Sequence, residues 1–259
     1  MQVALFITCL VDGFVPEVGE ATVRVLTAAG CDVACPLGQT CCGQPAWNAG
    51  FAPEAARVAR TTLAALEGAV DEGAEAVVVP AGSCATMVRV FWPELFETVG
   101  DHDAAARARA LGDRTWELTE LIDRLPLPPL ALDEPTRVAW HHSCHLLREL
   151  GVRDAPGRVL DRIEGCDRVA WTADERCCGF GGLFSFKLPE VAVAMADDKL
   201  SSLDHADPEA DEVVGADSSC LMHLRARADH EGRPIRTRHL AELLAAALPD
   251  PDTDDGPEP

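Results

Sequence analysis

Short apolar runs and amphipathic stretches alternate along this chain. In the first half, three apolar runs predict buried strands, at 2–8, 32–36 and 76–79. Four stretches with helical spacing predict helices, at 16–29, 53–69, 88–99 and 116–125. The third of these is helical only in part, because Pro93 interrupts it. The alternating order of strands and helices predicts an α/β layer with a small parallel sheet.

The second half repeats this plan at an offset of about 136 residues. Pro53-Glu54 recurs as Pro189-Glu190, and Val77-Val78 recurs as Val213-Val214. Several coincidences at one common register indicate tandem duplication. We therefore expect an α/β fold with two tandem, duplicated Rossmann-like lobes, each with a small parallel sheet, related by pseudo-two-fold symmetry.

Breaks in the pattern predict the domain boundaries. The proline-rich segment 126–136 cannot continue a helix and predicts a linker. The first lobe then spans 1–125, and the second spans 137–248 and ends in an Ala- and Leu-rich helix. Residues 249–259 are acidic and proline-rich with almost nothing to bury, so we expect a disordered tail.

Eight of the eleven cysteines form two matching sets of four. Each set has an early cysteine, an adjacent pair followed by glycine, and a last cysteine 42 residues beyond that pair. The first quartet is Cys9, Cys41, Cys42 and Cys84, and the second is Cys144, Cys177, Cys178 and Cys220. The outer members of each quartet follow predicted strands, and ligands collect at the carboxyl ends of parallel strands. We expect each quartet to converge at one edge of its own sheet.

Four converging thiolates can hold an iron–sulfur cluster or zinc. Adjacent side chains of a strand point to opposite faces, so one small ion needs a sharp bend at Cys41-Cys42, which Gly43 permits. A cluster is larger, and adjacent thiolates can then ligate different irons. The chemistry favours an iron–sulfur cluster and leaves zinc, or redox thiols with a vicinal disulfide, as alternatives. Four glycines are expected to let the backbone approach this group: Gly43, Gly179, Gly181 and Gly182.

Composition restricts the partners and the compartment. The net charge of −21 argues against nucleic acid and anionic membrane surfaces, because both would repel the chain. Residues 1–11 have no basic segment, and no uncharged run of 18 apolar residues occurs, so we expect neither a signal peptide nor a transmembrane segment. We therefore expect a cytoplasmic protein, in which disulfides rarely persist and cysteine indicates metal or redox chemistry.

The motifs resemble those of the cysteine-rich CCG-domain proteins, which include the cysteine-rich subunit of heterodisulfide reductase and the iron–sulfur subunit of glycolate oxidase. Within that family the chain is similar to the lactate-utilisation protein A branch, through Cys-Cys-Gly-Gln-Pro at 41–45, Ser-Cys-Ala-Thr-Met at 83–87, Cys-Cys-Gly-Phe-Gly-Gly at 177–182 and Ser-Ser-Cys-Leu-Met-His at 218–223. The likeness runs from Cys9 to about Leu248. It implies one iron–sulfur centre per lobe, held by the two quartets, and an electron-transfer subunit that works with companion iron–sulfur and lactate-utilisation subunits to oxidise L-lactate to pyruvate.

One departure from the family matters for the cluster type. The heterodisulfide reductase relative closes each motif with Cys-x-x-Cys, whereas Met87 and His223 stand at those closing positions here. Four cysteines per lobe are enough for a 4Fe-4S cubane cluster and argue against the non-cubane cluster of that relative. Two alternatives stay open: a catalytic subunit that acts on a hydroxy acid or a disulfide at a cluster, and a non-redox zinc-binding protein.

The remaining candidates have competing structural roles. Three histidines crowd Cys144 and are candidate metal ligands or proton carriers, or simply loop residues: His141, His142 and His145. Cys31, Cys35 and Cys166 lie outside the quartets and are expected to be structural. The chain shows no flavin or nicotinamide motif, so it is not expected to oxidise lactate alone.

Overall fold

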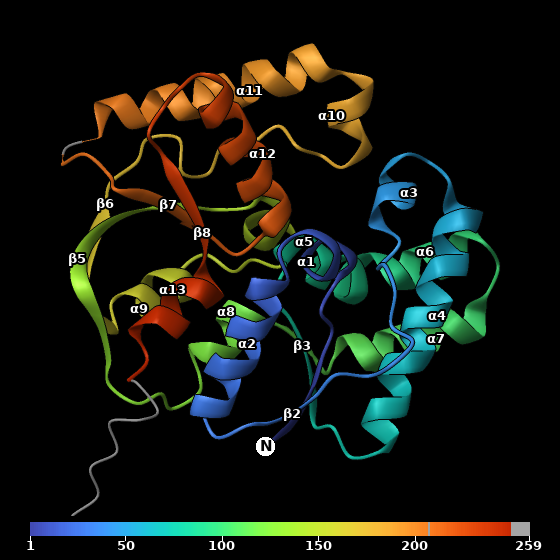
Figure 1. Cartoon of the computed structure of the whole chain (residues 1–259). Helices are drawn as coiled ribbons and strands as arrows, with labels where there is room; N and C mark the ends of the chain where they lie inside the picture. Colours follow the sequence, from blue (N-terminus) through green and yellow to red (C-terminus); the bar gives the residue numbers. More distant parts are fainter. Residues whose placement is uncertain (207, 250–259) are drawn as a thin grey trace, which may run out of the picture.

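The computed structural model describes residues 1–206 and 208–249, and it contains two four-stranded parallel sheets (Figure 1). The first sheet has the order β2-β1-β3-β4, with β1 (Gln2–Leu5), β2 (Asp32–Ala34), β3 (Ala76–Val79) and β4 (Thr115–Glu117). The second has the equivalent order β6-β5-β7-β8, with β5 (Leu130–His141), β6 (Ile163–Val169), β7 (Glu212–Gly215) and β8 (Arg236–His239). The predicted α/β fold of two duplicated lobes is confirmed.

The central strands are apolar on both faces because helices cover both faces of each sheet. Every residue of β3 is buried, and Val3 of β1 pairs with Val33 on one side and with Ala76 on the other. In the second sheet, Ala139 of β5 pairs with Val213 of β7 in the same parallel arrangement. The short strands therefore form a core that helices must close from both sides.

Helices on the outer faces shield the two sheets separately. On the first lobe these are α4 (Ala52–Asp71), α6 (Trp92–Thr98) and α7 (His102–Gly112), and on the second they are α11 (Pro189–Ser201) and α12 (Ser218–His230). Proline stands in the first turn of α4 and α11, where its missing N–H costs nothing. Pro93 also stands in the first turn of α6, so the interrupted stretch 88–99 continues as a helix after a π-helical turn at Met87–Phe91.

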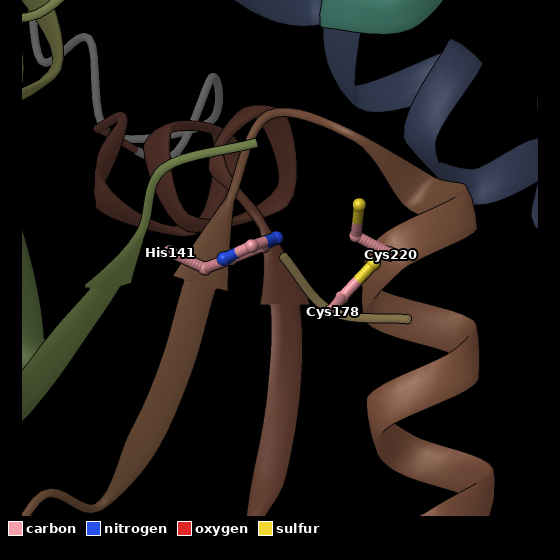
Figure 2. A group of neighbouring side chains, drawn as sticks. All are labelled: His141, Cys178 and Cys220. Atoms are coloured by element: carbon pink, nitrogen blue, oxygen red, sulfur yellow. The ribbon is translucent and has the colours of Figure 1, made fainter. Parts of the chain in front are cut away.

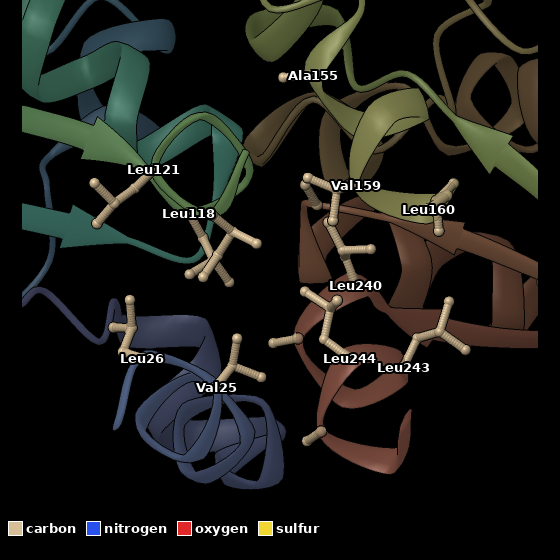
Figure 3. Packing of buried hydrophobic residues seen from close by; sticks show 14 of the residues in the cluster. Val25, Leu26, Leu118, Leu121, Ala155, Val159, Leu160, Leu240, Leu243 and Leu244 are labelled. Atoms are coloured by element: carbon tan, nitrogen blue, oxygen red, sulfur yellow. The ribbon is translucent and has the colours of Figure 1, made fainter. Parts of the chain in front are cut away.

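A shared apolar core joins the two lobes. It is built by α2 (Pro16–Ala28) and α8 (Leu118–Ile122) from the first lobe, and by α9 (Ala155–Leu160) and α13 (Leu240–Ala247) from the second (Figure 3). Helix α2 packs against α13, and α8 packs against α9. Because α2 corresponds to α9 and α8 to α13 in the duplicated plan, the two contacts exchange under a pseudo-two-fold rotation. The lobes are therefore held as one unit by equivalent helices.

The remaining helices are short and lie near the loops that follow the strands. They are α1 (Cys9–Phe14), α3 (Gln44–Asn48), α5 (Gly82–Thr86) and α10 (Leu183–Lys187), with a π-helical turn at His145–Glu149 and a 3₁₀ turn at Ser202–His205. Among residues 1–206 and 208–249, no helix combines the length and apolar character that crossing a bilayer requires.

Two local predictions were wrong. The helix predicted at 116–125 is instead strand β4 followed by α8, because Thr115 and Trp116 pair with Val77 and Val78 of β3. Residues 130–136, predicted within the linker, form the first part of β5, whose pairing shifts register between Ala131 and Thr136. The shift absorbs Pro135, which lacks the N–H of a regular ladder. The tail predicted at 249–259 lies, from residue 250 onward, outside the described residues.

Candidate metal centre between the lobes

The cysteines of each quartet reach one place from three loops of their own lobe. Cys9 begins α1 directly after β1, and Cys84 lies in α5 directly after β3. Cys144 follows β5, and Cys220 lies in the first turn of α12 after β7. The adjacent pairs stand in the loops that precede α3 and α10. All eight therefore lie beyond the carboxyl ends of the parallel strands, as the strand order predicts.

The thiols of each quartet lie close together. The sulfur atoms of Cys42 and Cys84 lie 3.3 Å apart, and Cys9 and Cys41 are near enough to shift each other's pKa. In the second quartet the sulfur atoms of Cys178 and Cys220 lie within 4.8 Å of each other, and Cys144 and Cys177 are near enough to shift each other's pKa. All eleven cysteines are free thiols. The structure thus brings both predicted quartets together, and their role as metal ligands stays a prediction.

The two quartets face each other across one cavity. This cavity has a volume of about 260 Å³, and all eight cysteines of the quartets line it. Apolar side chains from both lobes complete its wall, among them Leu10, Pro45, Leu183 and Phe186. The sequence predicted a site at the edge of each sheet, but it did not reveal that the two edges meet.

Glycine shapes the turn that follows each adjacent pair. Gly43 has φ of +88° and Gly179 has φ of +93°, a region that side chains rarely adopt. A Cβ atom at Gly43 would also stand 2.8 Å from the carbonyl oxygen of Ala55. In this conformation the N–H groups of Gly43 and Gly179 donate to the sulfur atoms of Cys41 and Cys177, each at 3.4 Å. The other two predicted glycines, Gly181 and Gly182, line the cavity.

Hydrogen bonding selects one thiolate in each quartet. Bonds from Cys42 and Cys9, together with the N–H of Gly43, lower the pKa of Cys41. Bonds from Cys144 and Cys178, together with the N–H of Gly179, lower the pKa of Cys177. The first cysteine of each adjacent pair is therefore the most acidic thiol of its quartet, and the thiolate is the form that binds metals.

One carboxylate links the two lobes at the site. Asp217 accepts a hydrogen bond from the backbone N–H of Ser219 at 3.2 Å, and so caps its own helix α12. Its other oxygen accepts from the backbone N–H of Ser83 at 2.8 Å, at the start of α5 in the first lobe. The equivalent position in the first lobe is Ala81, so a single side chain serves both helices. Asp217 was missed by the sequence reasoning.

The histidines near the site have different environments. His145 lies with Nδ1 3.7 Å from the sulfur of Cys144, and its Nε2 accepts from Gln44 of the first lobe at 3.2 Å. Nδ1 of His142 accepts from the indole N–H of Trp140 at 3.2 Å. Nε2 of His223 lies 3.4 Å from the carbonyl oxygen of Ala192. His145 therefore connects the second quartet to the residue after the first Cys-Cys-Gly.

The sequence pattern of one protein family, described as a cysteine-rich domain and named CCG, matches this chain twice, at residues 3–89 and 138–225. These two matches contain both quartets. The chain belongs to the CCG family. It is also similar over nearly its whole length to curated proteins named "Lactate utilization protein A". That of Geobacillus kaustophilus is 42% identical over 247 residues, which are 95% of this chain and 99% of the relative.

Two further relatives of this CCG protein carry similar names. "Lactate utilization protein A" of Anoxybacillus flavithermus is 41% identical over 94% of this chain and 99% of its own, and "Lactate utilization protein A 2" of Bacillus cereus is 38% identical over 96% and 99%. Among solved structures, a hypothetical protein from Helicobacter pylori matches with a TM-score of 0.64 and 10% identity, over 97% of this chain and 50% of that one. That last likeness shows the fold alone.

The two lobes of this CCG protein differ in the buried side chains that contact the cysteine-bearing loops. Lys199 is fully buried, and its ammonium donates to the carbonyl oxygens of Ala173, Asp174 and Arg176 in the loop that leads to Cys177. Burial lowers the pKa of Lys199 to about 8, and burial together with Lys199 holds the pKa of His141 well below its ordinary value. Lys199 differs from its counterpart in the first lobe, Leu63, and this difference between the halves is visible in the sequence.

The donor set fits a thiolate-bound metal centre in each lobe. Each quartet offers four free soft sulfur donors, and soft thiolates select zinc or iron–sulfur clusters over hard cations. Hydrogen bonding to Cys41 and to Cys177 raises the pKa of Cys9 and of Cys144 respectively, and burial and charge repulsion from neighbouring sulfurs add to the rise. A bound cation would remove that repulsion.

Proposed function

We propose that this chain is an iron–sulfur electron-transfer subunit of a multi-protein system that oxidises L-lactate to pyruvate. The observation that carries the proposal is the convergence of two matched quartets of free thiols on one cavity. The names of relatives that are about 40% identical over nearly the whole chain supply the substrate. Cys9, Cys41, Cys42 and Cys84 hold one centre in this proposal, and Cys144, Cys177, Cys178 and Cys220 hold the other.

The chemistry divides between this chain and its companions. Oxidation of lactate to pyruvate releases two electrons and two protons, and a bound iron–sulfur cluster supplies one-electron transfer. The residues of this chain hold the two centres, while the N–H groups of Gly43 and Gly179 stabilise the negative charge on the sulfurs. The last two cysteines of each quartet are buried, and the first two are more accessible to solvent. Companion iron–sulfur and lactate-utilisation subunits exchange the electrons and supply the lactate site.

A second candidate function is favoured by the cavity itself. Because both quartets line one hollow, a small hydroxy acid or a disulfide that entered it would contact both centres at once. The chain would then be the catalytic subunit. Steady-state turnover of lactate by the purified chain with an artificial electron acceptor separates the two. The electron-transfer role predicts no turnover until companion proteins are added, and turnover by the chain alone supports the catalytic role.

The metal content tests both candidates. Anaerobic purification followed by iron, sulfide and zinc analysis should give about eight iron and eight sulfide per chain, the content of one four-iron cluster per lobe. Cys41→Ser and Cys177→Ser should each remove about half of the iron and one of two electron paramagnetic resonance signals. Cys35→Ser, outside both quartets, is the matched control and should keep the full content. A colourless protein with stoichiometric zinc and no sulfide would refute both candidates and support a zinc-binding role.

A further inference from the structure

His141 stands beside the second quartet, at the last position of β5. One of its ring nitrogens and the sulfur atoms of Cys178 and Cys220 all lie within 4.8 Å of one another, and the ring points toward the two thiols (Figure 2). The three side chains are buried, with 0%, 2% and 7% of their surface exposed. Donor atoms that share one metal lie roughly 3.5–4 Å apart at the usual bond lengths of about 2.0 Å to nitrogen and 2.3 Å to sulfur. A small adjustment brings these three to that spacing.

The imidazole of His141 is buried without a hydrogen bond. Neither ring nitrogen has a partner at hydrogen-bond geometry among the described residues, although the backbone of Asp174 lies close enough to favour the charged ring. A buried polar group without a partner costs about 1–3 kcal/mol, and an absent ion is one physical reason for such a group. His142 and His145 by contrast have partners, Trp140 and Gln44.

Packing alone does not require a histidine here. The equivalent residue of the first lobe is Phe6, which is also fully buried at the end of the corresponding strand. An apolar ring therefore fills this position in a lobe of the same plan. A phenyl ring at this position would avoid the free-energy cost of an unpaired nitrogen. We therefore attribute the histidine of the second lobe to its ability to donate a nitrogen ligand.

We propose that His141 is a nitrogen ligand of the metal in the second centre, beside Cys178 and Cys220, so that this centre has a mixed sulfur and nitrogen donor set. The first centre, with Phe6 in the equivalent position, is held by cysteine alone. This inference rests on the metal centres of the proposed function. Imidazole suits both iron and zinc.

The inference predicts unequal centres. Where the neutral imidazole of His141 takes the place of a thiolate on one iron of the second centre, it raises the reduction potential of that centre. The buried ammonium of Lys199 acts in the same direction, because it stabilises the more negative reduced state. The second centre is therefore reduced before the first in a potentiometric titration. His141→Phe, which copies the first lobe, should bring the two potentials closer together.

The decisive experiment is pulsed electron paramagnetic resonance on the reduced, full-length protein, after iron, sulfide and zinc have been measured. A metal-bound imidazole gives a strong nitrogen coupling, which ¹⁵N-histidine labelling converts to its isotopic pattern. His141→Phe should lose this coupling and keep the iron content. The control is His145→Gln. In the native chain Nδ1 of His145 lies 3.7 Å from the sulfur of Cys144, and the variant without this ring should retain the coupling. If the second centre holds zinc, X-ray absorption should show nitrogen in its shell that His141→Phe removes.

The outcomes separate this inference from the proposed function. Iron and sulfide without a directly bound histidine nitrogen would overturn the role of His141 and leave the electron-transfer proposal intact. A coupling that survives in His141→Phe would also overturn it. Protein that binds neither iron nor zinc would overturn both. If His141→Phe does not fold, the labelled native protein decides whether histidine is bound, and His141→Leu with the His145→Gln control decides which one.

Discussion

The position of Asp217 predicts that one carboxylate holds the two lobes in register at the site. Its side chain is 2% exposed and accepts hydrogen bonds from the backbone N–H groups of Ser83 and Ser219 and from the hydroxyl of Ser219. Replacing it by alanine leaves two backbone donors at helix starts without partners. A hydrogen bond to a charged group contributes about 1.5–3 kcal/mol, and removing a helix cap costs about 0.5–2 kcal/mol.

The expected cost of Asp217→Ala is therefore about 3–4 kcal/mol of unfolding free energy, after allowing for the charge that no longer needs to be buried. Asp217→Asn keeps the shape and one good acceptor oxygen, so it should lose only about 1–2 kcal/mol. The matched control is Asp101→Ala. Asp101 caps only α7, through the N–H of Ala104 at 3.1 Å, and its ion pair with Arg60 is partly exposed. Its loss should cost about 1 kcal/mol.

Urea unfolding of the metal-free chain, with thiols kept reduced, measures these differences. Asp217→Ala should also weaken retention of iron in both lobes. The reason is that Asp217 accepts hydrogen bonds from the first turns of both α5, which carries Cys84, and α12, which carries Cys220. The reasoning is refuted if Asp217→Ala costs no more than Asp101→Ala. It is equally refuted if the iron loss is confined to the second lobe, since the bond to Ser83 would then do nothing for the first.

Other positions give independent tests. Burial raises the pKa of Glu117 from 4.5 to about 8, so the folded state favours the protonated form and native stability falls as pH rises through that window. Between these two pH values, the unfolding free energy of Glu117→Gln should rise relative to that of the native protein by about 1.4 kcal/mol per pH unit. A difference in unfolding free energy that does not change with pH, measured by urea unfolding, would contradict this. Gly179→Ala should lower the unfolding free energy by about 2–4 kcal/mol and lose the second centre, because the φ of Gly179 is +93°. The control Gly68→Ala has open space around the new methyl group and should raise the unfolding free energy by about 0.5–1 kcal/mol. Equal shifts of the melting temperature in the two variants would contradict the role of the turn geometry. Lys199→Met should lower the unfolding free energy by about 3 kcal/mol, because it removes the donor to three loop carbonyl oxygens. It should also lower the reduction potential of the second centre. An unchanged potential in an EPR-monitored titration would argue against an electrostatic role for Lys199.

The duplicated plan and the membership of each quartet can be predicted from the chain alone. The run at 76–79 is apolar at every position, so its strand follows from local composition, and the structure has it with the same bounds. The two Cys-Cys-Gly turns follow from glycine at positions where φ is positive. These features depend on neighbours in the chain, and for that reason they can be predicted from it.

Other features depend on residues that are distant in the chain, and only the packing of the two lobes reveals them. Thr115–Glu117 is a strand only because β3 offers it an open edge to pair with, and three residues are too few to show an alternating pattern. The shared cavity exists because α2 packs on α13 and α8 on α9, which turns the two quartets toward each other. The apolar faces of those helices are visible in the sequence, but their partners are not, because hydrophobic burial is not directional. The same holds for the bond between Asp217 and the N–H of Ser83. The cap that Asp217 places on its own helix involves neighbours in the chain, whereas the hydrogen bond from Ser83 of the other lobe exists only because the lobes pack together.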